Sequence, residues 1–464
     1  MNRKFFVFLN RILLFRKDEG RNLSVAVTRT FSGGIHPSEI GNGKAATKEQ
    51  SIINVPAPAK VTIPMSMHGG APASICVKVG QTVNLGQLIG EPQGYISASV
   101  HASVSGRVCA LTQSVIPSGK SVPAVVIEND FEDRWDESIT SLQHKGDVTQ
   151  EEIIECARSL GVVGLGGATF PTAVKLDTSK LDPKPDTLII NGSECEPYLT
   201  SDHRLMVEEA DRIADGVSLA MKASGCKKAI IGIEDNKPDA VSALQQASNG
   251  RYEVVALPAK YPQGFEKMLI YSLTGRKVPN GGLPSAVQCV VLNVGTCEAL
   301  SRAVRDGHPI VDRVVTVAGK VKNPGNYRVR IGMNAMDLIE YAGGLDNDVC
   351  KLIVGGAMMG NTIPSLNIPI TKNFGGFVAL GKEGIAPPES ACIRCGRCLR
   401  ACPMQLFPSR IDAFVRHQDY DSAISAGAMN CMECGSCTYV CPAKRELTQS
   451  IRIAKAIART KPKK

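Results

Sequence analysis

The chain has 464 residues, 43% of them hydrophobic and 21% charged, which is typical of about three globular domains. No run reaches the roughly 18 apolar residues that a membrane-spanning helix needs, so a channel or transporter acting alone is excluded. The net charge is +9, and 13 Lys and Arg against 6 Asp and Glu lie in the last 76 residues, beside eight of the 16 cysteines. A cysteine-bound cluster would supply negative charge there, so no nucleic-acid partner is expected. The irregular cysteine spacing indicates a reducing compartment rather than a secreted disulfide framework.

Residues 1–28 are expected to be an extension outside the first domain. The apolar stretch from Phe5 to Phe15 is interrupted by Asn10 and Arg11, and no small-residue cleavage site follows it. A signal peptide needs an unbroken apolar centre, so none is predicted. A short amphipathic segment on a membrane surface is a second interpretation, but an unstructured extension is favoured.

Residues 29–135 are predicted to form a β domain. Short β-branched runs alternate with glycine turns, and 75–80 and 85–90 are expected to be paired strands. The pattern resembles the barrel-sandwich fold of biotinyl and lipoyl carrier domains. Those carriers present a lysine at a hairpin tip, whereas the matching stretch here is Val100-His101-Ala102, so no swinging arm is predicted. We interpret His101 as a structural or interface histidine, because a lone histidine has no partner spacing for a metal.

Residues 136–311 alternate between helical and strand patterns. Strands of about five residues separated by helices imply a largely parallel sheet covered on both faces. The expected helices are 151–160 and 205–223, and the expected strands are 187–191, 229–233, 252–257 and 287–291.

The third unit, 312–363, resembles a β-grasp (SLBB) module, with expected strands at 314–317 and 327–329 and a helix at 335–342. We expect a Pro/Gly-spaced linker at 364–388, a ferredoxin-type segment at 389–446 and a basic C-terminal helix or tail at 447–464. The predicted fold class is therefore multidomain α/β plus β: a barrel-sandwich, a parallel-sheet domain, a β-grasp domain and a helical ferredoxin-like domain.

The cysteine segment contains the pattern C-x2-C-x2-C-x3-C-P twice. Three thiolates at this spacing surround one face of a cubane cluster, and the fourth ligates the neighbouring cluster. We therefore predict two [4Fe–4S] clusters, one held by Cys392, Cys395, Cys398 and Cys441, the other by Cys431, Cys434, Cys437 and Cys402. Two zinc knuckles are the alternative, but zinc sites usually pair cysteines as two separated couples, which explains the repeated three-plus-one run poorly.

A glycine-rich loop spans Gly161 to Pro171. It fails as a Rossmann fingerprint because a helical pattern precedes it and Thr169 stands at the last glycine position of G-x-G-x-x-G. Its backbone N–H groups could still approach a flat ring or a phosphate, although a tight packing turn explains the loop alone equally well. Further along, Asn191 to Pro197 follows a buried strand, at the edge of a parallel sheet where α/β sites are built.

These motifs resemble the FMN- and NADH-binding motifs of the flavoprotein subunit of respiratory complex I, namely Gly164 to Thr172, Lys175, Asn191 to Pro197, Tyr261 to Glu266 and Asn293 to Thr296. That subunit lacks a tandem ferredoxin tail. The full order of modules, including Gly33-Gly34-Ile35-His36-Pro37, resembles the C subunit of Rnf-type electron transport complexes from about residue 29 to the end.

The resemblance implies a set of site residues. The glycines and the lysine would hold the FMN phosphate and ring: Gly164, Gly166, Gly167 and Lys175. The polar strand-end residues Asn191, Asn293 and Thr296 would hydrogen-bond the flavin, and Glu194 and Glu196 would line the nicotinamide side. Phe170 would pack near the adenine or the ring, and Tyr261, Gly264 and Glu266 complete the cofactor-binding set. Thr169, Ser193, Cys195 and Phe265 depart from the complex I pattern, which puts the nucleotide contacts at Ser193 and Phe265 in question.

The resemblance also implies a function. Nicotinamide gives up hydride, clusters accept single electrons, and a flavin between them exchanges both. We expect NADH oxidation through FMN and two clusters, in a complex that couples NADH and ferredoxin to Na⁺ or H⁺ transport, reversibly. The chain would be a peripheral subunit on the cytoplasmic face of the inner membrane. A microcompartment-type cobalamin reductase is an alternative that the β domain argues against, because such a chain would open with the flavin domain. A cluster-only electron-transfer adapter is the third possibility.

Overall fold

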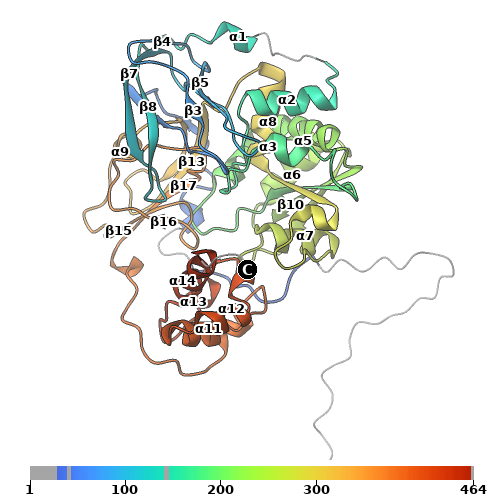
Figure 1. Cartoon of the computed structure of the whole chain (residues 1–464), viewed down its shortest axis with the longest axis vertical. Helices are drawn as coiled ribbons and strands as arrows, with labels where there is room; N and C mark the ends of the chain where they lie inside the picture. The colour runs from blue at the N-terminus through green and yellow to red at the C-terminus, as the bar shows by residue number, and fades with distance from the viewer. Residues whose placement is uncertain (1–28, 39–42, 141–145, 461–464) are drawn as a thin grey trace, which may run out of the picture.

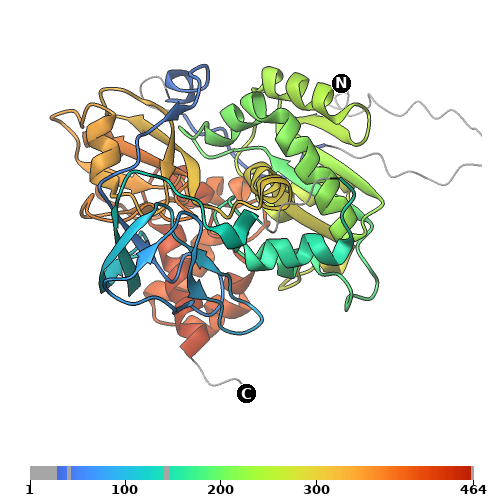
Figure 2. The same ribbon diagram turned by 90° about the horizontal axis from the view of Figure 1, so that it is seen from above.

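The computed structural model describes residues 29–38, 43–140 and 146–460, so the predicted extension at 1–28 lies outside the described residues. Figures 1 and 2 show the α/β domain on one side and the two β domains, the barrel-sandwich and the β-grasp domain, on the other. The helical C-terminal domain lies against these two sides. Within the described ranges, no helix combines the length and the apolar character needed to cross a bilayer.

The first domain consists of two antiparallel sheets packed face to face. The larger has the order β2 (Lys60–Pro64), β8 (Ser121–Asn129), β7 (Gly106–Val115) and β4 (Thr82–Val83). The smaller has the order β3 (Ser74–Ile75), β5 (Leu88–Glu91) and β6 (Val100–His101). Alternating residues such as Val61 and Ile63 fill the space between them, as the period of a strand requires. His101 is buried in this core, and burial lowers its pKa to about 3, as suits a structural, neutral side chain.

The second domain is built on a four-stranded parallel sheet, as expected. Its strand order is β11 (Glu253–Leu257), β10 (Lys228–Glu234), β9 (Thr187–Gly192) and β12 (Cys289–Asn293). Leu188 and Ile190 face the helices α2, α5 and α8, whereas Ile189 faces α7. The strands are apolar throughout because both faces are covered. The helices are α2 (Gln150–Ser159), α3 (Thr172–Leu176), α4 (Ser201–Glu208), α5 (Ala210–Ser224), α6 (Pro238–Ser248), α7 (Glu266–Thr274) and α8 (Val294–Asp306), with α1 (Glu137–Thr140) and the 3-10 turn η2 (Pro284–Val287).

The helix expected at 205–223 is in fact two helices that meet at Glu209, whose backbone leaves the helical region. The second, α5, lies unusually close to α8. A Cβ atom on Gly216 would be 1.8 Å from the carbonyl oxygen of Cys297, so only glycine permits this approach.

The third domain differs from expectation at its end. Its six-stranded sheet has the order β1 (Ile53–Asn54), β14 (Gly325–Arg330), β13 (Asp312–Gly319), β17 (Gly376–Leu380), β15 (Lys351–Val354) and β16 (Asn361–Thr362), with α9 (Ala335–Tyr341) packed on it. Strand β17 lies inside the expected linker at 364–388, and that expectation was wrong there. All five residues of β17 are buried. A five-residue apolar run carries no alternation, and the dense Pro and Gly around it suggested a linker instead.

The C-terminal domain contains α10 (Arg397–Ala401), α11 (Pro408–Arg416), α12 (Tyr420–Ser425), α13 (Ser436–Tyr439) and α14 (Leu447–Thr460), with the 3-10 turns η3 (Lys382–Gly384) before it and η4 (Ala428–Asn430) within it; η1 (Gly43–Ala46) lies near the N-terminus. The expected C-terminal helix is present as α14, and it packs against the rest of this domain. Its apolar side chains Ile451 and Ala454 pack with Ile411 of α11 in one core, so the ferredoxin-type domain extends to the end of α14.

Candidate flavin and cluster sites

The glycine loop connects α2 to α3 and closes on itself. The backbone N–H of Gly164 donates to the carbonyl of Phe170 at 2.9 Å, and the N–H of Leu165 donates to Thr296 Oγ1 at 2.9 Å. The residues that follow these two hydrogen-bond donors, Gly166, Gly167 and Ala168, are exposed. Thr169, which replaces a glycine of the resembling motif, has φ +46°, in the region that favours glycine. The loop thus presents backbone N–H groups beside the first turn of α8.

Two asparagines lie side by side below this loop. Asn191 and Asn293 are register partners at the carboxyl ends of β9 and β12. The Asn191 amide donates to the carbonyl of Gly264 at 2.7 Å, and Asn293 donates to Asp202 Oδ2 at 2.7 Å while accepting from Gly295 N–H at 2.9 Å. A Cβ atom on Gly166 would lie 3.1 Å from Asn293 Cβ, so the loop rests directly on the strand ends.

Lys175 closes a third side of this region. Its ammonium donates to Glu266 Oε1 at 2.8 Å and to the carbonyl of Val291 at 3.1 Å. Glu266 is the first residue of α7, so the pair joins α3 to the N-terminus of α7. Both side chains are about one-third exposed and can reach a bound molecule.

The surroundings fit a phosphorylated flavin. Four buried polar side-chain atoms have no hydrogen-bond partner within the described part of the chain: three in this domain, Thr172 Oγ1, Ser193 Oγ and Gln263 Oε1, and His101 Nδ1 in the first domain. A Cβ on Gly264 would stand 3.4 Å from Ser193 Cβ, so two of the three flank that glycine. Buried polar atoms are rarely left unpaired in a native protein. Unpaired hydroxyl and amide oxygens beside exposed glycine backbone are what a polar ring and a phosphate would satisfy.

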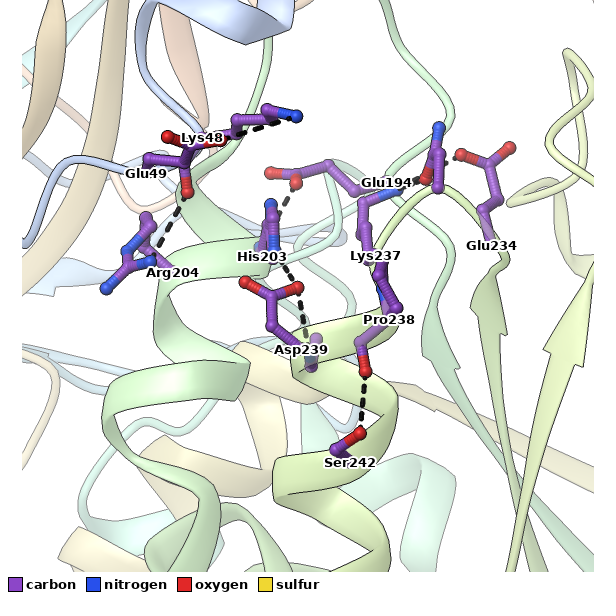
Figure 3. A network of polar contacts seen from close by, with 12 residues as sticks. Lys48, Glu49, Glu194, His203, Arg204, Glu234, Lys237, Pro238, Asp239 and Ser242 are labelled. Carbon is purple, nitrogen blue, oxygen red and sulfur yellow. Dashed lines mark hydrogen bonds and ion pairs between the residues drawn. The ribbon is translucent and has the colours of Figure 1, made fainter.

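The two glutamates expected at the nicotinamide side point to different elements. The Glu194 carboxylate accepts from the backbone N–H groups of Asp202, at 2.7 Å, and His203, at 3.1 Å, so it caps the first turn of α4. Figure 3 shows His203 between Glu194 and Asp239, which accepts from the imidazole at 2.7 Å. Glu196 instead accepts from Met358 N–H at 3.0 Å, and its other carboxyl oxygen lies 3.4 Å from the Tyr261 hydroxyl oxygen. Burial raises its pKa to about 7.

A buried lysine that the sequence reasoning missed supports this turn. Lys237 is 1% exposed and donates to the carbonyl of Ser193 at 2.7 Å and to Glu234 at 3.1 Å (Figure 3). A buried ammonium is stable only when paired in this way. The signal was the polar run Glu234-Asp235-Asn236-Lys237, which begins at the last residue of β10, the neighbour of β9 in the sheet.

The eight predicted cluster cysteines gather in two groups of four. One cavity is lined by Cys392, Cys395, Cys398 and Cys441, which we call the outer cysteine site. The other is lined by Cys402, Cys431, Cys434 and Cys437, the inner cysteine site. In each group the fourth thiol comes from the other run, in agreement with the exchanged-ligand pattern.

The lining of each cavity has the donor set of a cysteine-ligated cluster: four cysteines, three from one run and one from the other. Around the inner site, Leu406 N–H donates to Cys402 Sγ and Glu433 N–H to Cys431 Sγ, each at 3.3 Å. Hydrogen bonds to ligand sulfur are what tunes a cluster's potential.

Tyr261 joins the two kinds of site. Its hydroxyl donates to the carbonyl of Cys434 at 2.7 Å, and its ring packs with Ile35, Ala401 and Cys434. Ile35 pairs with Tyr261 backbone to backbone, and Gly34 N–H donates to the carbonyl of Ala401 at 2.9 Å. The loop that begins at Tyr261 ends at Glu266, the partner of Lys175. One short loop therefore contacts both the inner cysteine site and the glycine-loop site.

Four family models match the chain in the expected order. Residues 29–132 match the RnfC barrel sandwich hybrid domain, 157–302 the Nuo51 FMN-binding domain, 314–362 the SLBB domain and 391–444 a 4Fe-4S dicluster domain. The matches confirm the predicted fold class and the cofactor types, FMN and [4Fe–4S] clusters.

Several curated proteins align with nearly the whole chain. The C subunit of the proton-translocating ferredoxin:NAD(+) oxidoreductase complex of Clostridium ljungdahlii is 45% identical, over 92% of this chain and 94% of its own. The C subunit of the Na(+)-translocating ferredoxin:NAD(+) oxidoreductase complex of Acetobacterium woodii is 46% identical, over 92% and 96%. The C subunit of the ion-translocating oxidoreductase complex of Rhodobacter capsulatus is 41% identical, over 92% and 82%. The crystal structure of an air-oxidised NAD+-reducing [NiFe]-hydrogenase overlaps 60% of this chain and 54% of its own at 24% identity and a TM-score of 0.48, which is too distant to carry an argument. With such identity to the curated proteins over almost its full length, the chain belongs to the RnfC family, which provides the C subunits of Rnf-type ion-translocating oxidoreductase complexes.

Proposed function

We propose that this chain oxidises NADH through a bound FMN and passes single electrons through two [4Fe–4S] clusters to the other subunits of a membrane-bound electron transport complex. The reaction is reversible, and the complex couples ferredoxin:NAD(+) electron transfer to Na⁺ or H⁺ transport. The protein is peripheral and lies on the cytoplasmic face of the membrane. The observation that carries the proposal is the loop from Tyr261 to Glu266, which contacts the flavin-type site at one end and the inner cysteine site at the other.

The residues around the glycine loop divide the work of holding the flavin. The exposed backbone at Gly166 and Gly167 and the side chain of Lys175 supply N–H groups and a positive charge for phosphate and ring oxygens. The strand-end amide of Asn191 holds the Tyr261–Glu266 loop at Gly264, and that of Asn293 holds the N-terminus of α8. The remaining contacts are assigned to Gly164, Phe170, Tyr261, Gly264, Glu266 and Thr296.

The two carboxylates act on the same turn from opposite sides. Glu194 is committed to the α4 N-terminus, which orients the turn after β9, so it positions the nicotinamide side rather than touching it. Glu196, with its pKa near 7, holds or releases a proton at a carboxyl oxygen beside Tyr261.

When bound, the flavin supplies two-electron exchange with nicotinamide and one-electron exchange with the clusters. The protein excludes water between the sites: Tyr261 is 2% exposed, and Cys434 is buried with it. The eight thiolates Cys392, Cys395, Cys398, Cys441, Cys402, Cys431, Cys434 and Cys437 hold the clusters.

The test is anaerobic titration of the reconstituted full chain with NADH, followed by flavin absorbance and low-temperature EPR. We expect flavin bleaching and reduced-cluster signals at the same NADH equivalents. Cysteine-bound iron without extractable flavin, and no bleaching by NADH, would leave a cluster-only adapter and refute the proposal.

A further inference from the structure

The basic residues of the C-terminal domain fall into two groups. One group forms ion pairs within the domain: Arg416 with Glu389, Arg445 with Asp412, and Arg452 and Lys455 with Glu433. Six other cations are exposed and form no ion pair within the described part of the chain: Arg394, Arg397, Arg400, Arg410, Lys444 and Arg459. Four of these six, Arg394, Arg397, Arg400 and Lys444, line two adjoining hollows of the domain, and we call them the unpaired group.

The unpaired group surrounds the outer cysteine site. Arg394 and Arg397 line the cavity of that site. Arg397, Arg400 and Lys444 also line an adjoining open groove of about 460 Å³, whose wall includes Tyr439 and the ligand Cys441. The groove thus ends at a cluster ligand.

The outer site is also the one that faces solvent. Cys392 and Cys395 are exposed, and Ile393 and Leu399 beside them are 67% and 42% exposed. At the inner site Cys434 and Cys437 are each 7% exposed, and Tyr261 of the α/β domain covers Cys434. An apolar centre with a charged rim is the usual composition of a protein-binding surface.

We propose that this groove is the docking surface for an electron-carrier protein or subunit with an acidic surface, which exchanges one electron with the cluster of the outer cysteine site. The exchange oxidises one centre and reduces the other by a single electron, with no proton or bond involved. The inference rests on the proposed function, since it needs a cluster at the outer site. Complementary charge speeds and orients such an encounter, and an apolar patch beside the cluster allows close approach.

An anionic membrane surface would also attract these cations. The placement favours the protein partner, because these cations come from two separate segments and line a groove that includes the ligand Cys441, with the exposed Ile393 in the adjoining cavity. The lipid is accordingly an outcome of the test.

The experiment measures binding of a purified acidic two-cluster ferredoxin to the immobilised, cluster-loaded full chain. The variant is Arg397→Glu, Arg400→Glu and Lys444→Glu together. The matched control reverses three exposed, unpaired cations of the barrel domain and changes the net charge equally: Lys78→Glu, Arg107→Glu and Lys120→Glu. We expect the variant to weaken binding on the order of tenfold or more at low salt, the control to have little effect, and wild-type affinity to fall steeply with salt.

Equal weakening in variant and control, or wild-type binding that does not respond to salt, would overturn the proposal. So would loss of binding to vesicles of phosphatidylglycerol and phosphatidylethanolamine in the variant with ferredoxin affinity unchanged. The salt titration needs no variant, so a folding defect in the triple mutant does not decide the matter. A separate measurement reduces the chain with dithionite and follows electron transfer to the ferredoxin. This transfer does not depend on NADH, so a failure of the NADH reaction would concern only the proposed function.

Discussion

Replacing Glu196 with glutamine removes a carboxylate from the place where the α/β domain, the SLBB domain and the cluster domain meet. The carboxyl group accepts from Met358 N–H at 3.0 Å and has an oxygen 3.4 Å from the Tyr261 hydroxyl oxygen, whose single proton is donated to the carbonyl of Cys434. Glutamine can keep this arrangement: its amide oxygen accepts from Met358, and its NH₂ donates to the tyrosine oxygen. The substitution therefore isolates the charge.

The charge has a calculable cost. Burial raises the pKa of Glu196 from 4.5 to about 7, which at 1.36 kcal/mol per pKa unit makes the ionised form cost about 3 kcal/mol. Between these two pKa values the folded chain retains a proton that the unfolded chain loses. The free energy of unfolding therefore falls as pH rises through this window, and above pH 7 the full cost is present. The Glu196→Gln chain lacks this slope.

Amide hydrogen exchange at Met358 and Cys434 measures the local stability around Glu196. A global unfolding transition would not do so, because the domains of a multidomain chain need not unfold together. After correction for intrinsic rates, wild-type protection is expected to fall on the order of 100-fold between about pH 5 and about pH 8.5, with glutamine showing little change. Exposed Glu91→Gln is the control and should follow wild type. Iron content should be equal in all three chains. Parallel pH responses in wild type and Glu196→Gln would refute the assignment of the slope to this residue.

Three further substitutions test other contacts. Gly166→Val crowds the carboxyl end of β12, so the amount of extracted FMN should drop severalfold while the iron content stays unchanged. An unchanged flavin content would show that the glycine loop is not part of the flavin site. Gly216→Ala places a methyl group against the carbonyl of Cys297 and should cost about 1–3 kcal/mol in thermal unfolding, unless α5 and α8 separate freely. Asp312 accepts from Arg302 at 2.9 Å, and although burial opposes it, this pairing lowers the Asp312 pKa to about 2. Asp312→Asn should cost about 3–5 kcal/mol in urea at neutral pH, and the difference from wild type should shrink as pH falls from 3.8 towards 2; a constant difference would contradict the pairing.

The two groups of cysteines and the parallel sheet were predictable because their signals are local. Each cysteine run lies within a dozen residues, and the strands of the α/β domain are apolar runs that need no knowledge of their neighbours. Strand β17 was missed because its signal is not local. Its burial comes from pairing with β13 and β15 rather than from any pattern of its own.

The amino-acid sequence by itself determined which residue types occur at ligand spacing, and hence the clusters, the module order and the family. The tertiary structure decided where side chains point. Glu194 and Glu196 are two residues apart, yet they serve a helix in their own domain and a loop of another. The cations of the C-terminal domain look alike in sequence, but only some meet a carboxylate. Tyr261 reaches Cys434 across 173 residues of chain. Such contacts depend on the direction of a side chain and the packing of distant segments, which spacing along the chain does not encode.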